Sequence, residues 1–153
     1  MSQVHRESRV LLTGIGLVTP LGLTIEENWS NLLAGKSGID KITHFDAAHL
    51  GTHIAGEVRN FDPGQYMDHK EVRHYDRFVH MAIGAADKAL ADAGLTAETL
   101  PHDETGIIVG SGMGGMETFV DNTRLLIEKG ARRVSPFFVP ATISNMASGL
   151  LTI

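Results

Sequence analysis

Residues 135–146 read Ser-Pro-Phe-Phe-Val-Pro-Ala-Thr-Ile-Ser-Asn-Met, and this stretch constrains the fold more than any other in the chain. Its two prolines impose an extended approach and then a sharp helix entry, because Pro140 fits the first helical turn. Apolar residues recur after it at helical spacing, which predicts an apolar helix. These residues are Ile143, Met146, Ala147 and Leu150. We expect Phe137 and Phe138 to lie in a buried loop beside that helix. Their rings are then either part of the ordinary core or the wall of an apolar pocket.

Strand signals occur in three places upstream of this stretch. Residues 9–13 are apolar and β-branched enough for a buried strand, and residues 105–109 predict a second one. The region 36–65 is irregular, with a short strand expected at 53–58. Because helical segments separate these strands, we expect an α/β fold with a mostly parallel sheet and helices on its faces.

Three helices are expected before residue 135. Thr24 and Glu27 form a capping box for the first, which Gly35 closes. Asp68 or Glu71 caps a longer second helix that runs to Gly94, and the third spans roughly 116–129. The apolar residues of each helix fall on one face, which we expect to be buried. These faces comprise Ile25, Trp29, Leu32 and Leu33; then Tyr75, Phe78, Val79, Ala82, Ala86, Ala89, Leu90 and Ala93; then Phe119, Val120, Thr123, Leu126 and Ile127.

A glycine-rich turn follows the predicted strand at 105–109. Gly110, Gly112 and Gly115 match the spacing Gly-x-Gly-x-x-Gly before a helix, which is the context of a dinucleotide site. That signature also needs an acidic residue about twenty positions later, at the end of another strand. Residues 130–133 read Gly-Ala-Arg-Arg instead. The alternative is that these glycines permit a tight turn and close packing.

Basic residues form a second group of candidates. Lys70, Arg73 and Arg77 recur at intervals of three and four, on one helical face if that helix begins early. Arg132 and Arg133 follow the third predicted helix. They are either a solvated face or a docking surface for an acidic partner.

Composition excludes several classes of protein. The 153 residues carry a formal net charge of −5, which argues against a general nucleic-acid binder. No apolar run approaches the roughly 18 residues of a membrane span, and the polar residues 1–8 are unlike a signal peptide. The chain has no cysteine, which agrees with the cytoplasm. Of the eight histidines, His69, His74 and His80 do not sit on one helical face, and no cysteine or carboxylate completes a cluster, so we expect no metal site.

Three motifs together resemble the β-ketoacyl-acyl carrier protein synthases, the elongating condensing enzymes of fatty-acid synthesis. They are Arg-Val-Leu-Leu-Thr-Gly-Ile-Gly at 9–16, Gly-Ser-Gly-Met-Gly-Gly at 110–115, and the stretch at 135–146. They occur in the family's order, and the resemblance runs from about Arg9 to Ile153. It implies the N-terminal part of a thiolase-like layered α/β/α fold, with 1–153 as an incomplete synthase domain.

The resemblance implies a decarboxylative Claisen condensation between an acyl-enzyme and malonyl-acyl carrier protein. The family works through a cysteine nucleophile and two histidines and needs no organic cofactor or metal. No catalytic residue of that set is present here, because the chain lacks cysteine and the family's histidines lie later. We therefore expect this chain alone to be inactive.

The resemblance also assigns roles to particular residues. Met113 and Phe138 correspond to residues that line the acyl pocket, and the counterpart of Phe138 reaches the pocket of the partner subunit in a homodimer. The positions of Lys70, Arg73, Arg132 and Arg133 contact the acidic acyl carrier protein.

Other classes remain as alternatives. One alternative is that the chain is a non-catalytic fragment or a partner subunit of the chain-length-factor type, which keeps the fold and lacks the cysteine. A degradative thiolase shares the fold but does not resemble the stretch at 135–146, and a dinucleotide oxidoreductase rests only on the glycine spacing.

Overall fold

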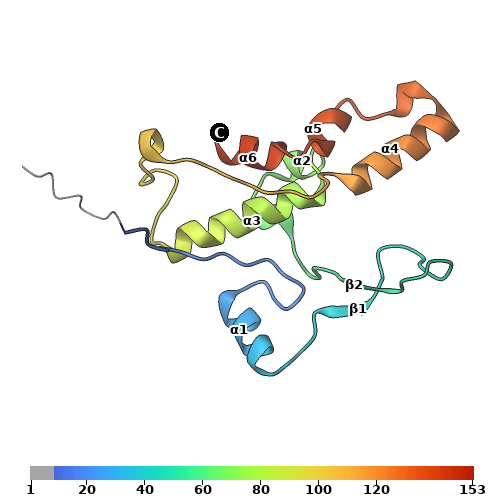
Figure 1. Ribbon diagram of the computed structural model, residues 1–153. Coiled ribbons are helices and arrows are strands. Elements are labelled where there is room, and N and C mark those ends of the chain that lie inside the picture. Colours follow the sequence, from blue (N-terminus) through green and yellow to red (C-terminus); the bar gives the residue numbers. More distant parts are fainter. Residues whose placement is uncertain (1–8) are drawn as a thin grey trace, which may run out of the picture.

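The computed structural model describes residues 9–153 and consists mainly of short helices joined by extended segments (Figure 1). Residues 1–8, whose polar character argued against a signal peptide, lie outside the described residues. Every helix within 9–153 is too short or too polar to span a bilayer. The elements are α1 Ile25–Leu33, β1 Ile39–Lys41, β2 Ile54–Gly56, α2 His69–Val72, α3 Arg77–Asp92, α4 Met116–Lys129, α5 Phe138–Thr142 and α6 Met146–Leu151, with 3₁₀ turns at Pro63–Gln65, His102–Glu104 and Ala131–Arg133.

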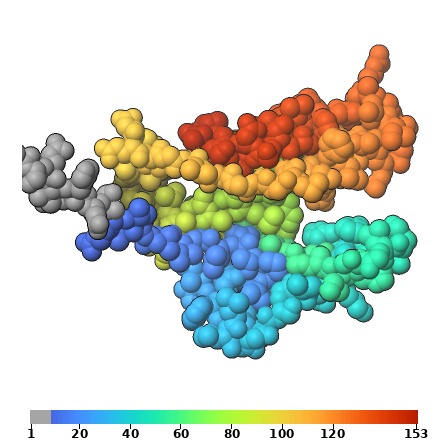
Figure 2. All heavy atoms as spheres, viewed as in Figure 1, coloured from blue at the N-terminus to red at the C-terminus, as the bar shows by residue number. Residues whose placement is uncertain are grey.

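Helix α3 runs through the middle of the molecule and separates two lobes (Figures 1 and 2). On one side of it lie α4, α5 and α6, with α6 packed along α3 and α5 packed on α4. On the other side lie α1 and the β1–β2 pair. The two strands are antiparallel, with Ile39 opposite Gly56 and Lys41 opposite Ile54.

Two extended segments lie against α3, and they are the segments expected as buried strands. Residues 13–14 and 105–110 line one groove of about 600 Å³ whose floor is the alanine-rich side of α3. A Cβ on Gly14 or Gly16 would collide with the backbone oxygens of Ala89 and Ala85, so glycine and alanine together allow the close approach. Asp92 fixes this contact, because its Oδ2 accepts the N–H of Ile15 at 2.8 Å.

The expected buried strands form no ladder, which corrects the prediction for residues 9–13 and 105–109. Val10 and Ile108 are both 98% exposed, and the backbone there pairs with no strand among residues 9–153. The described residues therefore contain one antiparallel pair, whereas a mostly parallel sheet was expected. A buried strand needs partner strands at its edges and packing on both faces. The apolar side chains of residues 9–13 and 105–109 have neither among the described residues.

The first helix begins as predicted, but it buries a different face from the one expected. The Oγ1 of Thr24 accepts the N–H of Glu27 at 3.1 Å, and the Glu27 carboxylate accepts the N–H of Leu23 at 2.8 Å. The apolar face expected to be inward is exposed at Trp29, Leu32 and Leu33. Asn28 is buried instead, because its side-chain amide donates to the carbonyls of Gly22 and Thr24 and so holds the preceding turn.

The long second helix is broken into α2 and α3. Asp68 caps α2 as predicted, accepting the N–H of Lys70 at 2.8 Å, and Gly94 follows the end of α3 at φ +68°. Between the helices, residues 73–76 leave the helical path, and Asp76 directs its carboxylate to a different helix. The apolar helix after residue 140 is also divided, because Ile143 adopts an extended conformation between α5 and α6.

The third helix has the predicted bounds, and its buried face differs from the prediction. The residue that α4 buries is Asn122, whereas Phe119, Val120, Leu126 and Ile127 are exposed and Thr123 lies at the surface. Periodicity identified the apolar face of the helix, but the packing partner of that face is not among the described residues.

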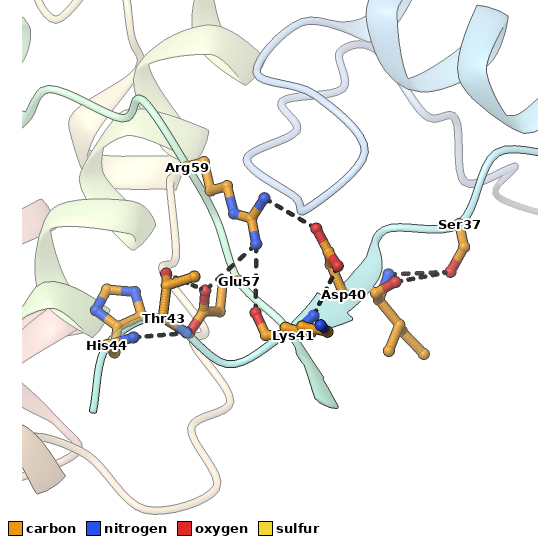
Figure 3. A network of polar contacts seen from close by, with 8 residues as sticks. Ser37, Asp40, Lys41, Thr43, His44, Glu57 and Arg59 are labelled. Atoms are coloured by element: carbon orange, nitrogen blue, oxygen red, sulfur yellow. Dashed lines mark hydrogen bonds and ion pairs between the residues drawn. The ribbon is translucent and has the colours of Figure 1, made fainter. Parts of the chain in front are cut away.

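A buried carboxylate organises the lobe of β1 and β2 (Figure 3). Glu57, directly after β2, accepts the N–H groups of Thr43 and His44 through Oε1 at 2.9 and 3.1 Å. Its Oε2 accepts the Thr43 hydroxyl at 2.7 Å, and Arg59 lies 3.7 Å away. The hydrogen bonds from Thr43 lower the pKa of Glu57 to about 2. Glu57 thus ties the chain leaving β1 to the chain leaving β2.

We predict that Glu57 makes stability depend on pH in the acid range. The folded state holds the pKa of Glu57 at about 2, below the 4.5 of a free glutamate, so its contribution is complete above pH 4.5. That contribution is lost as pH falls from 4.5 toward 2. Glu57→Gln should flatten this part of the profile of melting temperature against pH, whereas Glu128→Gln, at an exposed position of α4, should not. Equal profiles for wild type and Glu57→Gln would contradict the prediction.

Candidate functional site

The glycine-rich turn rests directly on α5. The N–H of Gly115 donates to the carbonyl of Thr142 at 3.0 Å, and Gly114 adopts φ +73°, which favours glycine. A Cβ on Gly115 would collide with the backbone oxygen of Ala141 and would lie 2.9 Å from the Cβ of Asp76. The turn that carries Met113 is therefore seated on the helix that carries Phe138.

Asp76 secures the other side of this turn. It is only 7% exposed, and its Oδ2 accepts the N–H of Thr118, in the first turn of α4, at 2.8 Å. Gly115 is the N-cap of α4 and has no side chain to cap it. Asp76, forty-two residues before Thr118, supplies the capping carboxylate from the start of α3.

This arrangement accounts for the glycine at position 115 without a nucleotide. A dinucleotide pyrophosphate would need the free N–H groups and positive end of the following helix. Here the carboxylate of Asp76 already occupies that end of α4, and the N–H of Gly115 is bonded to Thr142. Residues 131–133 form a 3₁₀ turn at the place where the signature needs the acidic end of a strand. The geometry therefore favours close packing as the role of Gly115.

Two further buried polar residues extend the contacts of Asp76. Asn122 of α4 accepts the N–H of Ser135 at 2.8 Å and donates to the carbonyl of Thr118 at 2.9 Å. His80 of α3 donates from Nε2 to the carbonyl of Val72, at the end of α2, at 3.0 Å. Burial lowers the pKa of His80, which keeps the ring neutral near pH 7. Sequence reasoning missed Asp76, His80 and Asn122 because a polar residue in a helix gives no sign of burial.

The two adjacent phenylalanines lie at the surface, and the expected buried loop is absent. The ring of Phe137 stacks on His74 with centroids 3.7 Å apart and planes inclined by 14°. Phe138 is partly buried and packs on Phe119 of α4 at 5.7 Å. Met113 is 72% exposed at the tip of the glycine turn. Met113 and Phe138 thus belong to adjoining segments, but this geometry leaves their shared pocket as a prediction.

The basic candidates do not share one helical face. Lys70 lies on α2 and Arg73 follows it, both exposed, whereas Arg77 belongs to α3 and donates to the carbonyl of Val58 at 2.5 Å. Arg132 and Arg133 are exposed on the 3₁₀ turn after α4.

A polar cavity of about 400 Å³ lies beside Arg73. Asp76, Glu117, Asp121 and Asn122 also line it, so the cavity carries acidic as well as basic side chains. Of the four exposed basic candidates, Arg73 is the one that lines it.

Several histidines have local roles. His74 stacks on Phe137, His80 binds the carbonyl of Val72, and His102 binds that of Ala97 at 2.8 Å. Within residues 9–153, no three side chains of histidine, cysteine, aspartate or glutamate are placed to share a metal ion.

Comparison with known proteins identifies relatives along nearly the whole chain. The family described as "Beta-ketoacyl synthase, N-terminal domain" matches residues 7–153. Proteins named "3-oxoacyl-[acyl-carrier-protein] synthase 2" are 43% identical over 147 residues in Synechocystis sp., 47% over 145 in Vibrio cholerae and 45% over 150 in Staphylococcus aureus. These alignments cover 96%, 95% and 98% of this chain but only 35%, 35% and 36% of the relatives. The chain thus spans about a third of their length.

Solved structures confirm the thiolase-like α/β fold class. "The ishigamide ketosynthase/chain length factor" superposes with a TM-score of 0.77 at 28% identity, over 92% of this chain and 35% of that one. A β-ketoacyl synthase from Burkholderia phymatum gives 0.74 at 24% identity, over 91% and 35%. A type II PKS acyl-carrier protein in complex with its ketosynthase gives 0.72 at 21%, over 93% and 37%. The last two likenesses concern the fold alone.

We predict that Gly115→Ala destabilises the protein by about 2 kcal/mol or more, because the added methyl group meets the backbone of α5. Gly112→Ala is the matched control, since a Cβ there meets no atom within 4 Å and the glycine has no positive φ. Its effect should stay within about 0.5 kcal/mol. Urea denaturation of both variants measures the difference, and equal midpoints would show that Gly115 is not tightly seated.

Proposed function

This chain belongs to the β-ketoacyl synthase family, and from that membership we propose that the complete protein elongates fatty acyl chains on acyl carrier protein. The observation that carries the proposal is the identity of 43–47%, over 95–98% of the chain, to relatives named 3-oxoacyl-[acyl-carrier-protein] synthase 2. The proposed reaction is the decarboxylative condensation of an acyl-enzyme with malonyl-acyl carrier protein.

The reaction proceeds in two transfers. A cysteine thiolate attacks the thioester of the acyl carrier, so that an acyl-enzyme forms and the carrier thiol leaves. Malonyl carrier then loses carbon dioxide, and the resulting carbanion attacks the acyl-enzyme and releases the thiolate. The printed chain contains no cysteine, so this proposal assigns the thiol to the remainder of the complete protein. For the chain by itself we propose no condensation activity.

Within this proposal, the present residues shape the acyl pocket. The seating of Gly115 on α5 holds the turn of Met113 beside the helix of Phe138. Methionine is flexible and polarisable, and it suits a wall that must accommodate acyl chains of different length. We assign Met113 and Phe138 to the pocket wall, the latter across the contact between two subunits of a homodimer.

The exposed basic residues are assigned to carrier docking. Lys70 and Arg73 are exposed on α2 and directly after it, and Arg132 and Arg133 are exposed on the 3₁₀ turn after α4. A small basic surface raises the rate of encounter with an acidic carrier protein. A carrier protein complexed with its ketosynthase is among the structures that share this fold. We place this encounter in the cytoplasm.

A second candidate is a partner subunit without catalysis. It is favoured by the likeness to the solved ishigamide ketosynthase/chain length factor. A condensation assay of the complete protein separates the candidates. Product formation supports the synthase, whereas activity that appears only after a second, cysteine-containing subunit is added supports the partner.

We predict that Arg132→Glu combined with Arg133→Glu raises the KM for acyl carrier protein on the order of tenfold at low salt, because attraction becomes repulsion. Lys36→Glu with Lys41→Glu, exposed in the other lobe, changes the net charge equally and is the control. Turnover of a small synthetic thioester, which lacks the carrier, should be unchanged in both variants. An unchanged KM for the carrier in the arginine variant would contradict the docking role and show that Arg132 and Arg133 are only solvent-exposed charges.

We predict that Met113→Phe suppresses the elongation of long primers and spares short ones. One methylene that cannot fit costs roughly 1–3 kcal/mol, enough to change selectivity tenfold or more. The measurement is kcat/KM across primers of graded length, with the volume-conserving Met113→Leu as control. An equal loss at every length would mean that the substitution damages packing and does not narrow a pocket.

A further inference from the structure

Asp76 lies between two parts of the chain with different proposed roles, the basic residues of carrier docking and the glycine turn of the acyl pocket. It begins α3, three residues after the exposed Arg73, and it is buried. Its carboxylate bonds the first turn of α4, which directly follows the glycine turn of Met113. The Asp76 side chain therefore joins the segment of Arg73, assigned above to carrier docking, to the glycine turn of Met113, assigned to the acyl pocket.

The contact fixes position by both charge and shape. The carboxylate accepts the N–H of Thr118 at 2.8 Å at the positive end of α4. Its Cβ stands 2.9 Å from where a Cβ on Gly115 would lie, and the backbone oxygen of Ala141 lies still closer to the same point. The turn is thus held between Asp76 and α5, with little room to shift.

Neighbouring bonds make the arrangement continuous. His80 attaches the end of α2 to α3 through Val72, and Asn122 attaches α4 to Ser135, just before Phe137 and Phe138. Asp76 is the member of this series that bridges α3 and α4. Removing its carboxylate frees the α4 end of the turn while the other two bonds remain.

We propose that Asp76 is a positioning residue that sets the glycine turn and, through Met113, the acyl-length selectivity of condensation. This inference rests on the proposed function. Asp76 touches no reacting atom; it acts by holding the wall that Met113 presents. A wall that can shift by a fraction of a methylene distinguishes long from short chains less sharply, because each misfitted methylene carries a large factor in rate.

The experiment compares three variants of the complete protein: Asp76→Ala, Asp76→Asn and Asp92→Ala. Asp92 is the matched control, because it lies at the other end of α3 and its carboxylate also accepts a distant backbone N–H, that of Ile15. The measurements are melting temperature and kcat/KM over a series of acyl primers. Asp76→Ala should change the ratio of long- to short-primer kcat/KM by about threefold or more. Asp76→Asn keeps an acceptor oxygen and should restore most of the ratio, and Asp92→Ala should lower the melting temperature and leave the ratio unchanged.

A folded Asp76→Ala enzyme with wild-type selectivity would overturn the inference, as would an equal loss at all primer lengths in Asp76→Ala and Asp92→Ala. Where Asp76→Ala does not fold, Asp76→Ser gives the same test, because serine is a favoured N-cap for α3 while it removes the carboxylate that accepts the N–H of Thr118. This variant should move the ratio of long- to short-primer kcat/KM away from the wild-type value, as expected for Asp76→Ala. An unchanged ratio refutes the positioning role. Failure of the proposed function is distinct, since the wild-type protein itself would then show no condensation.

Discussion

Hydrogen bonds that backbone N–H groups donate to buried side chains distant in the sequence hold this chain together. Within residues 9–153, the bonds of Asp76 with Thr118 and of Asn122 with Ser135 join segments that no strand ladder connects, and the bond of Glu57 with Thr43 reinforces the β1–β2 pair. Among residues 9–153, Val79 is the one large side chain that is fully buried. With little apolar packing available, the elements depend on polar contacts, and a buried acceptor that loses its donor is costly.

The two lobes use the same device at different places. Glu57 gathers two N–H groups and a hydroxyl to join the chain after β1 to the chain after β2. Asp76 gathers the N–H at the start of α4. Carboxylates suit this task because an ionised acceptor makes shorter and stronger hydrogen bonds than a neutral one. The same charge also disfavours a phosphate at the end of α4.

Local signals in the sequence were accurate, and signals that depend on a distant partner were not. The capping box of Thr24, the end of α3 near Gly94 and the bounds of α4 follow from residues a few positions apart. The family followed from three motifs. Periodicity correctly marked apolar faces on α1 and α4, but it cannot say what covers them. The predicted strands at 9–13 and 105–109 were wrong for the same reason, because a ladder needs partner strands that their local sequence does not reveal. Asp76, His80 and Asn122 were missed because their partners lie 42, 8 and 13 residues away in the sequence.

The site separates what is fixed from what can vary. The place of the glycine turn is set by backbone atoms of Ala141 and Thr142 and by Asp76, so any side chain at position 115 would disturb it. The exposed side chain of Met113 does not take part in that seating, whereas Phe138 packs on Phe119 of α4. Met113 can therefore change in size without moving the frame that presents it. A wall built in this way lets substitutions at Met113 alter selectivity at small cost to folding, while the frame tolerates few changes at Gly115 or Asp76.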